Sequence, residues 1–283
     1  MDININVPVN RKLERNSVGR IKIKSVDKSQ KCIKITLAVL VILTGIGFIT
    51  FDYKDLDFMK ALGETLINVK VMFFEATLSH FSFKELINQV IKTISLSFIT
   101  TVIGGCIAII LGLFAANNLS SIKTSNIIKG IVAFVRAIPT VLWVLIFAVT
   151  AGLGSEAAIL GMTFHTVAYL VKAYSETFEE LDEGVIEALK ASGASFWQIV
   201  FQAILPSSLT SILAWTFMRF EINFTNAVAM GAAAGAGGIG FELFMSSNFY
   251  FNVREVGFIT IAILGFAVVL EIFSTRVKNK YLA

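Results

Sequence analysis

The chain has 283 residues, of which 55% are hydrophobic and only 16% are charged, and its formal net charge is +4. A soluble domain usually holds about 45–50% apolar and about 25% charged residues, so the composition argues against an ordinary soluble protein. Several apolar runs reach about 20 residues, the length that a helix needs to cross a bilayer. Because these runs are continuous and do not alternate with polar residues, they predict spanning helices and not a barrel.

The first apolar run follows a long basic segment. Residues 1–32 are polar and carry eight Lys and Arg side chains, and the apolar run covers 33–51. A signal peptide would have a short basic region and a small-residue cleavage site, so we expect an uncleaved first helix with a cytoplasmic tail before it. Residues 52–87 are then an extracytoplasmic loop. Within it, 58–74 has apolar residues at helical spacing, which fits either a helix on the outer membrane surface or a mobile loop.

Residues 88–275 form the predicted membrane core, and 276–283 form a basic cytoplasmic tail. Proline removes a backbone donor and disfavours a helical residue before it. Pro139 and Arg136 interrupt one apolar stretch, where we expect a break between a lead-in on the membrane surface and the span itself. The further spans are predicted at about 90–116, 127–151, 156–174, 206–225 and 256–273.

The basic residues indicate the orientation of these spans. With the N-terminus inside, the predicted inner segments hold 15 Lys and Arg residues, whereas the long outer loop at 52–87 holds four. Cytoplasmic segments carry an excess of basic residues, so this distribution favours six spans with both ends in the cytoplasm. The sequence therefore predicts an all-α membrane protein that folds as a six-span helical bundle.

The inner segment at 184–206 carries a pattern of its own. Good helix formers precede Gly193, which can end a short helix because glycine accepts a left-handed cap without penalty. Phe196 and Trp197 are large apolar side chains on a cytoplasmic loop, as at a docking surface. Pro206 suits the first turn of the next helix. These residues fit either a short rigid helix presented to a soluble partner or a connector lying on the membrane.

The same segment resembles the signature, named for Glu-Ala-Ala, of permeases from ATP-binding-cassette (ABC) importers. The signature is Glu-Ala-Ala, three residues, Gly, nine residues, Ile, one residue and Leu-Pro. The residues that match are Glu187, Ala188, Gly193, Leu205 and Pro206. Leu189 and Ala203 depart from it, and both are apolar. The resemblance implies that the segment, with Phe196 and Trp197, forms a coupling helix seated in a cleft of a separate ATPase subunit.

Three further stretches resemble the phosphonate-transporter permeases, with methionine and other oxyanion permeases as relatives. They are Arg136–Thr140, Phe220–Asn223 and Gly235–Leu243. The family commonly has a basic residue shortly after the position of Asn223, where this chain has Thr225 and Asn226. The resemblance covers roughly 85–275. It implies the type I ABC importer permease fold shared with methionine permeases, a homodimer, two ATPase subunits that bind ATP and magnesium, and an extracytoplasmic solute-binding protein.

Ionisable residues inside spans are costly and tend to be functional. Arg219 and Glu221 are two positions apart, so they point to different faces and should not pair, and Glu221 and Asn223 approach the outer helix end. Arg136 fits either a pathway role or a simple boundary residue. His165 fits a hydrogen-bonded packing residue. The candidates for pathway or gate residues are Arg136, Pro139, Arg219, Glu221, Asn223, Gly235, Gly237, Gly238 and Gly240.

The glycine run from Gly235 to Gly240 literally fits a dinucleotide fingerprint, but it follows a span and has no strand before it. Close backbone packing explains these small residues better. The chain has no Walker sequence, no metal-ligand spacing, no catalytic cluster and no nucleic-acid signal, so we expect a transport subunit without its own ATPase site.

The function expected from the resemblance is that of the membrane-spanning permease of an ABC importer for phosphonate or a related oxyanion, in a bacterial inner membrane. Three alternatives stay open. The solute could be methionine or another polar nutrient. The chain could be an ion-coupled carrier, which would predict inverted repeats, or it could be a membrane scaffold that transports nothing.

Overall fold

The computed structural model of the chain describes residues 28–50 and 57–281, with side chains described for 30–50 and 57–276. The described residues are almost entirely helical and contain no strand, which confirms the predicted all-α class. The chain divides into a first unit, Met1–Ala61, and a second unit, Leu62–Ala283. Most of the predicted N-terminal tail lies outside the described residues.

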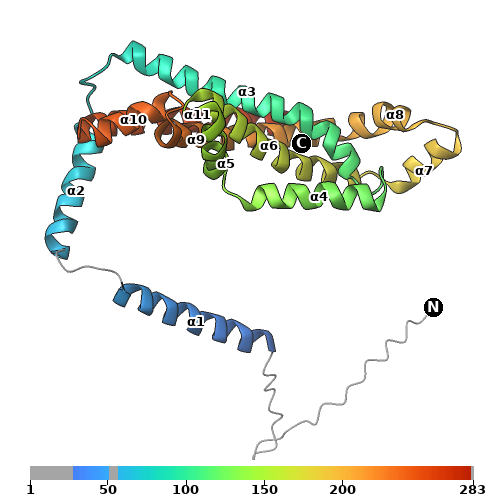
Figure 1. The fold of residues 1–283 in the computed structure, drawn as a ribbon, viewed down its shortest axis with the longest axis horizontal. Coiled ribbons are helices and arrows are strands. Elements are labelled where there is room, and N and C mark those ends of the chain that lie inside the picture. Colours follow the sequence, from blue (N-terminus) through green and yellow to red (C-terminus); the bar gives the residue numbers. More distant parts are fainter. Residues whose placement is uncertain (1–27, 51–56, 282–283) are drawn as a thin grey trace, which may run out of the picture. The chain divides into compact units, whose positions relative to one another are not determined.

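The described part of the first unit is dominated by α1, Lys28–Thr50, which confirms the helix predicted at 33–51 (Figure 1). Its apolar side chains are exposed, as expected for a helix that faces lipid. Helix α2, Phe58–Phe74, begins in this unit and continues into the second. The residues expected to form either a helix or a mobile loop are therefore helical.

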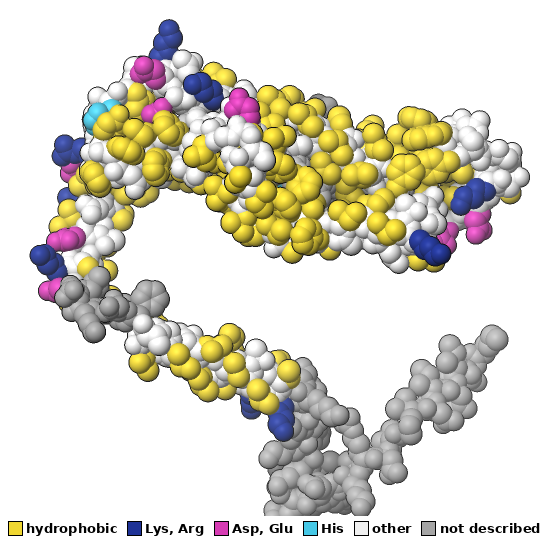
Figure 2. All heavy atoms as spheres, viewed as in Figure 1, with side chains coloured by type: hydrophobic (Ala, Val, Ile, Leu, Met, Phe, Trp, Pro, Cys, Tyr) yellow, Lys and Arg dark blue, Asp and Glu magenta, His cyan; other side chains and the backbone are white. Residues whose placement is uncertain are grey.

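The second unit is a bundle in which α6 is central, because α3, α4, α5 and α9 all pack against it (Figure 1). The helices of this bundle are α3 (Phe83–Ala115), α4 (Ile122–Ala137), α5 (Thr140–Ala151), α6 (Ser155–Glu179), α7 (Glu183–Ala191), α8 (Phe196–Ile199), a π-helical turn (Val200–Ile204), α9 (Leu205–Ala234), α10 (Ile239–Asn248) and α11 (Val253–Tyr281). Figure 2 shows hydrophobic side chains over the middle of this bundle and charged side chains towards its two ends. That distribution suits a body that crosses a bilayer.

Four helices of the described chain are long and apolar enough to cross a membrane, namely α1, α3, the helix that contains α9, and α11. The bent pair α4 and α5 raises this number to five if it is one span. Helix α6 is long enough but less apolar, since it carries Glu156, His165 and Lys172. Its neighbours in the bundle shield much of its surface, so it needs less apolar side-chain area. The six-span count stays a prediction.

The predicted break at Pro139 is confirmed. Helices α4 and α5 meet there at 91°. The Trp143 indole donates a hydrogen bond of 2.9 Å to the Val135 carbonyl, which lacks an N–H donor at Pro139 and otherwise accepts only the longer bond from the Ile138 N–H at 3.4 Å. That this lead-in lies on the membrane surface stays a prediction. Helix α4 packs along α3 and α6, with Val132 and Val135 buried, because one of its faces is apolar.

Several helices are longer than predicted, and the reason is clear for α3 and α9. Helix α3 begins at Phe83 because Ser82 and Glu85 form a capping box, in which each side chain accepts a hydrogen bond from the other residue's backbone N–H. Helix α9 ends at Ala234 and not near Thr225, because alanine is the strongest helix former and dominates these last turns.

Candidate functional site

The predicted coupling helix is α7. At its C-terminal end the Gly193 N–H donates to the Lys190 carbonyl and the Ala194 N–H donates to the Leu189 carbonyl, each at 3.0 Å. This pair of bonds is the Schellman arrangement, which requires a left-handed residue after the helix. Gly193 has φ of +83°, which confirms the predicted cap. A Cβ at this position would meet nothing within 4 Å, so only backbone conformation restricts the residue.

Helix α7 is anchored on one side and exposed on the other. Ile186 is buried and belongs to the core that includes Leu170, Phe178 and Ile199. Glu187 and Ala188, which match the importer signature, are exposed. The helix is therefore held by its apolar side and presents the signature residues to solvent.

The two predicted docking aromatics have different surroundings. Phe196 is half-buried and stacks on Phe114 of α3, with ring centroids 6.0 Å apart. Trp197 is 51% exposed and stacks on Phe201, which is 64% exposed. Phe201 was not predicted, although its spacing of four residues from Trp197 places both on one helix face. The exposed aromatic pair is thus Trp197 and Phe201, while Phe196 holds the segment to the bundle.

A continuous helix leads from this segment into the bundle, running from Phe196 to Ala234. Helix α9 itself begins at Leu205, next to the start predicted at Pro206, but the helical segment extends upstream to Phe196. Proline lacks an N–H and its ring collides with the carbonyl four residues earlier in a regular α-helix. Here the turn before it is a π-helix, in which the Leu205 N–H donates to the Val200 carbonyl five residues back. The wider turn accommodates Pro206 without a break.

The middle of α9 carries a buried polar centre. The Asn223 amide nitrogen donates to the hydroxyls of Thr101 at 2.9 Å and Thr166 at 3.0 Å, so it joins α9 to α3 and α6. Asn223 is completely buried. Its expected place near the outer helix end is wrong, because α9 continues for eleven residues beyond it.

Arg219 lies one turn before Asn223 and is 1% exposed. Its Nε donates to the Thr166 hydroxyl at 3.2 Å, and its Nη2 lies 3.1 Å from His165 Nδ1, which confirms a hydrogen-bonded His165. The guanidinium carbon lies 5.0 Å from the centroid of the Tyr169 ring, and that of Arg136 lies 5.8 Å from the same centroid. Within the described part of the chain, no carboxylate pairs with either arginine.

Glu221 is turned away from Arg219, and the predicted absence of a pair between them holds. One carboxylate oxygen of Glu221 is buried without a hydrogen bond among the described residues. The side chain lines a cavity of about 210 Å³ between α9 and α11. The other lining residues are Phe224, Thr225, Ala267, Leu270 and Glu271.

The glycine run forms the turn between α9 and α10. Gly235, Gly237 and Gly238 all have positive φ. A Cβ on Gly240 would overlap the Val228 carbonyl of α9, so α10 packs directly on the α9 backbone (Figure 1). Close packing, the preferred explanation, holds for Gly238 and Gly240, whereas Gly235 and Gly237 have open space around them and are favoured by their positive φ.

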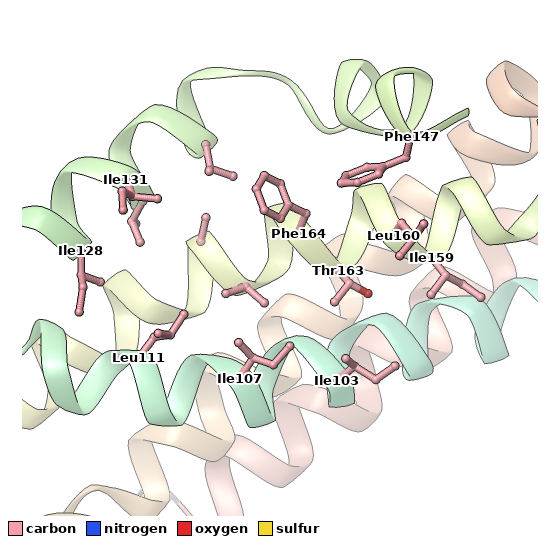
Figure 3. Close-up of a pocket in the computed structure, with 14 residues that line it drawn as sticks. Ile103, Ile107, Leu111, Ile128, Ile131, Phe147, Ile159, Leu160, Thr163 and Phe164 are labelled. Atoms are coloured by element: carbon pink, nitrogen blue, oxygen red, sulfur yellow. The ribbon is translucent and has the colours of Figure 1, made fainter. Parts of the chain in front are cut away.

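A groove in the second unit is a poor candidate for a polar solute. It has a volume of about 470 Å³ and is lined by α3, α4, α5 and α6, with Thr163 the sole hydroxyl among apolar side chains such as Ile107, Ile131 and Phe164 (Figure 3). An anion would lose its hydration there without gaining hydrogen bonds. None of the predicted pathway residues lines this groove.

Known proteins resemble the chain along most of its length. A phosphite transport system permease protein, PtxC of Stutzerimonas stutzeri, is 28% identical over 247 residues, which are 87% of this chain and 89% of that protein. A phosphate-import permease protein, PhnE of Mycolicibacterium smegmatis, is 27% identical over 197 residues, which are 69% of this chain and 37% of that longer protein.

Solved structures support the fold. A chain of the methionine ABC transporter MetNI, solved in an inward-facing conformation, superimposes on this chain with a TM-score of 0.64 at 22% identity. The match covers 72% of this chain and 99% of that chain. This likeness confirms the type I ABC importer permease fold. The model of the family described as "Binding-protein-dependent transport system inner membrane component" matches residues 108–282. The chain therefore belongs to this family and is the permease component of an ABC importer.

Proposed function

We propose that this permease forms, as a homodimer, the translocation pathway for phosphonate, phosphite or a related oxyanion. Two copies of a separate ATPase subunit bind and hydrolyse ATP with magnesium, and an extracytoplasmic solute-binding protein delivers the solute. The permease itself has no ATPase site. The names of its relatives, a phosphite permease and a phosphate permease, support the solute class.

The observation that carries the proposal is the geometry of the coupling segment. Helix α7 is capped rigidly at Gly193, exposes the signature residues, and is followed by a helix that continues without a break from Phe196 to Ala234. A force applied at Trp197 therefore reaches the middle of the bundle along one continuous helix that includes the π-helical turn, and residues 192–195 join α7 to this helix. Glu187, Ala188, Trp197, Leu205 and Pro206 serve this coupling, with Phe196 as the anchor.

The mechanism is a switch between two states that the ATPase biases. Closure of the ATPase dimer around ATP moves α7. The pathway between the two copies of α9 then switches from inward-open to outward-open. Helix α6 is the sixth span in this arrangement, and both chain ends lie in the cytoplasm of a bacterial cell. Residues 88–275 are the transport core, with 184–206 as its coupling loop.

The solute class is tested with the purified permease and ATPase in proteoliposomes, together with the binding protein. We expect uptake of phosphite, methylphosphonate or inorganic phosphate that requires ATP. Uptake of methionine and of none of the three anions would replace the proposed solute with an amino acid. Uptake driven by an ion gradient without the ATPase would contradict the whole proposal.

The coupling role is tested with Gly193→Asp. An aspartate side chain strains the left-handed cap and adds charge at the contact with the ATPase, so ATP hydrolysis should continue while uptake falls. Ser192→Asp is the matched control, because it places the same charge one position earlier, where the backbone is not left-handed. Normal uptake by Gly193→Asp would refute the coupling assignment.

A further inference from the structure

We infer that Arg136, Tyr169 and Arg219 form a binding station for a tetrahedral oxyanion within the bundle. The inference rests on the proposed import of an anion and adds to it a place where the anion is held. Nothing in the identity of the family requires such a site in the permease, because a binding protein already selects the solute outside the membrane.

The station lies about midway along the bundle. With a rise of about 1.5 Å per residue, Arg219 is about 21 Å from the start of α9 at Leu205 and about 22 Å from its end at Ala234. Tyr169 belongs to the middle of α6, and Arg136 lies in the last turn of α4, next to the break at Pro139. Three helices therefore bring two guanidinium groups to one aromatic ring.

The charge of the station is unbalanced. Arg219 contacts the Thr166 hydroxyl, the His165 ring and the Tyr169 ring, and none of these groups carries a formal negative charge. The ion pairs in the described part of the chain involve other basic residues. A buried positive charge without a partner attracts an anion, and its cost of burial falls when an anion is present.

Arg219 also keeps donors for such an anion. A guanidinium has five N–H groups, of which Thr166 and His165 occupy two, and Nη1 makes no hydrogen bond among the described residues. Because His165 Nδ1 accepts from Nη2, the ring hydrogen of His165 lies on Nε2, which can donate as well. The remaining fork suits two oxygens of a phosphate or phosphonate.

Arg136 supplies the approach to this site. Its side chain is exposed, whereas Tyr169 is half-buried and Arg219 is buried, so exposure decreases in steps from one guanidinium to the other. An exposed guanidinium is too costly against hydrocarbon, so this side of the bundle faces water or another protein chain. The anion passes from Arg136 to Arg219, and neither guanidinium lines the apolar groove of Figure 3.

The experiment measures ATP-dependent uptake of phosphite, methylphosphonate and inorganic phosphate by the complete complex in proteoliposomes. Arg219→Met and Arg136→Gln should each lower uptake of the transported anion about ten- to a hundredfold, the loss expected for a hydrogen bond to a charged group. Arg219→Lys should recover part of the loss because it restores the charge. Lys172→Gln is the control, since it removes a positive charge from α6 that already pairs with Glu176.

The outcomes separate the two proposals. If the natural complex transports none of the three anions, the proposed function fails. If it transports one of them and Arg219→Met and Arg136→Gln match its rate, the station is refuted and the proposed function stands. An equal loss in Lys172→Gln would also overturn the station. If Arg219→Met does not fold, as judged by its thermal unfolding, Arg136→Gln and Arg219→Lys decide the question.

Discussion

Two ionisable residues of the second unit are equally buried but have opposite surroundings. Glu255, near the start of α11, is completely buried, and Arg219, in the middle of α9, is 1% exposed. The Glu255 carboxylate accepts hydrogen bonds from the backbone N–H groups of Ser79 and His80 at 2.9 and 2.8 Å and from the Ser246 hydroxyl at 3.2 Å, and it lies 2.6 Å from His80 Nδ1. Arg219 has neutral partners only.

This difference in hydrogen-bond and charge partners distinguishes a buried charged residue that stabilises the fold from one that serves transport. The Glu255 carboxylate is satisfied by the donors around it, so its burial stabilises one arrangement of the segment before α3 against α10 and α11. The stacking of His80 on Tyr250, with centroids 3.9 Å apart, reinforces the same contact. Arg219 is left with an unbalanced charge, which the fold itself does not need. We therefore expect changes at Glu255 to affect stability and changes at Arg219 to affect transport.

The largest expected effect is that of Glu255→Ala. Removing the completely buried carboxylate takes away the acceptor shared by the backbone N–H groups of Ser79 and His80 and by the buried Ser246 hydroxyl, which should lower the free energy of unfolding by about 3–5 kcal/mol. Thermal unfolding of the purified permease in detergent measures the change. A loss below about 1 kcal/mol would show that this cluster does not hold the fold.

His80→Ala should have the next largest effect. It removes one hydrogen bond to Glu255 and the ring stacked on Tyr250, but the backbone N–H groups still satisfy the carboxylate. We expect a loss of about 1–2 kcal/mol in the same unfolding experiment. A loss as large as that of Glu255→Ala would mean that the side chain of His80 carries the whole contact.

Arg219→Met should change stability little, by less than about 1 kcal/mol, because an apolar side chain of similar length replaces a costly buried charge. Thr166 keeps its hydrogen bonds to Asn223, and His165 is only half-buried. Thermal unfolding beside Glu255→Ala gives the comparison directly. Equal destabilisation by the two variants would remove the distinction between the two residues.

The smallest effect is expected for Glu75→Ala. Glu75 pairs with Arg254 at 2.7 Å, but both side chains are largely exposed. Exposed pairs contribute about 0–1 kcal/mol and weaken with added salt. This variant is the control for Glu255→Ala, because it removes an acidic residue from the same end of the bundle.

Local rules predicted much of the fold. The break at Pro139 and the cap at Gly193 follow from the backbone chemistry of single residues, and the sequence signal for each is only a few residues long. The span limits were less accurate where a local signal was overlooked, as with Ser82 and Glu85, or where alanines extended α9 past Thr225. The family resemblance, carried by short motifs, identified the type of fold.

The sites depend on contacts that a single sequence does not reveal. His80 and Glu255 are 175 positions apart, and no sequence pattern near His80 predicts its contact with Glu255. Phe196 and Trp197 are neighbours with the same chemistry, and only the packing of Phe196 against Phe114 distinguishes them. Tyr169 was missed for the same reason, since its importance arises from two arginines on other helices. Arg219 itself was found because a charge inside a span is conspicuous.

The π-helical turn at Val200–Ile204 changes the rotation of the following helix, α9, about its own axis. Such a turn contains one residue more than an α-helical turn, and each residue of an α-helix advances the direction of its side chain by about 100°. That single extra residue therefore sets the angle between the side on which Trp197 points and the side on which Arg219 points. Shortening the turn by one residue would leave both ends of the helix intact but rotate one end relative to the other. Movement of Trp197 would then displace a different side of α9 from the one that carries Arg219.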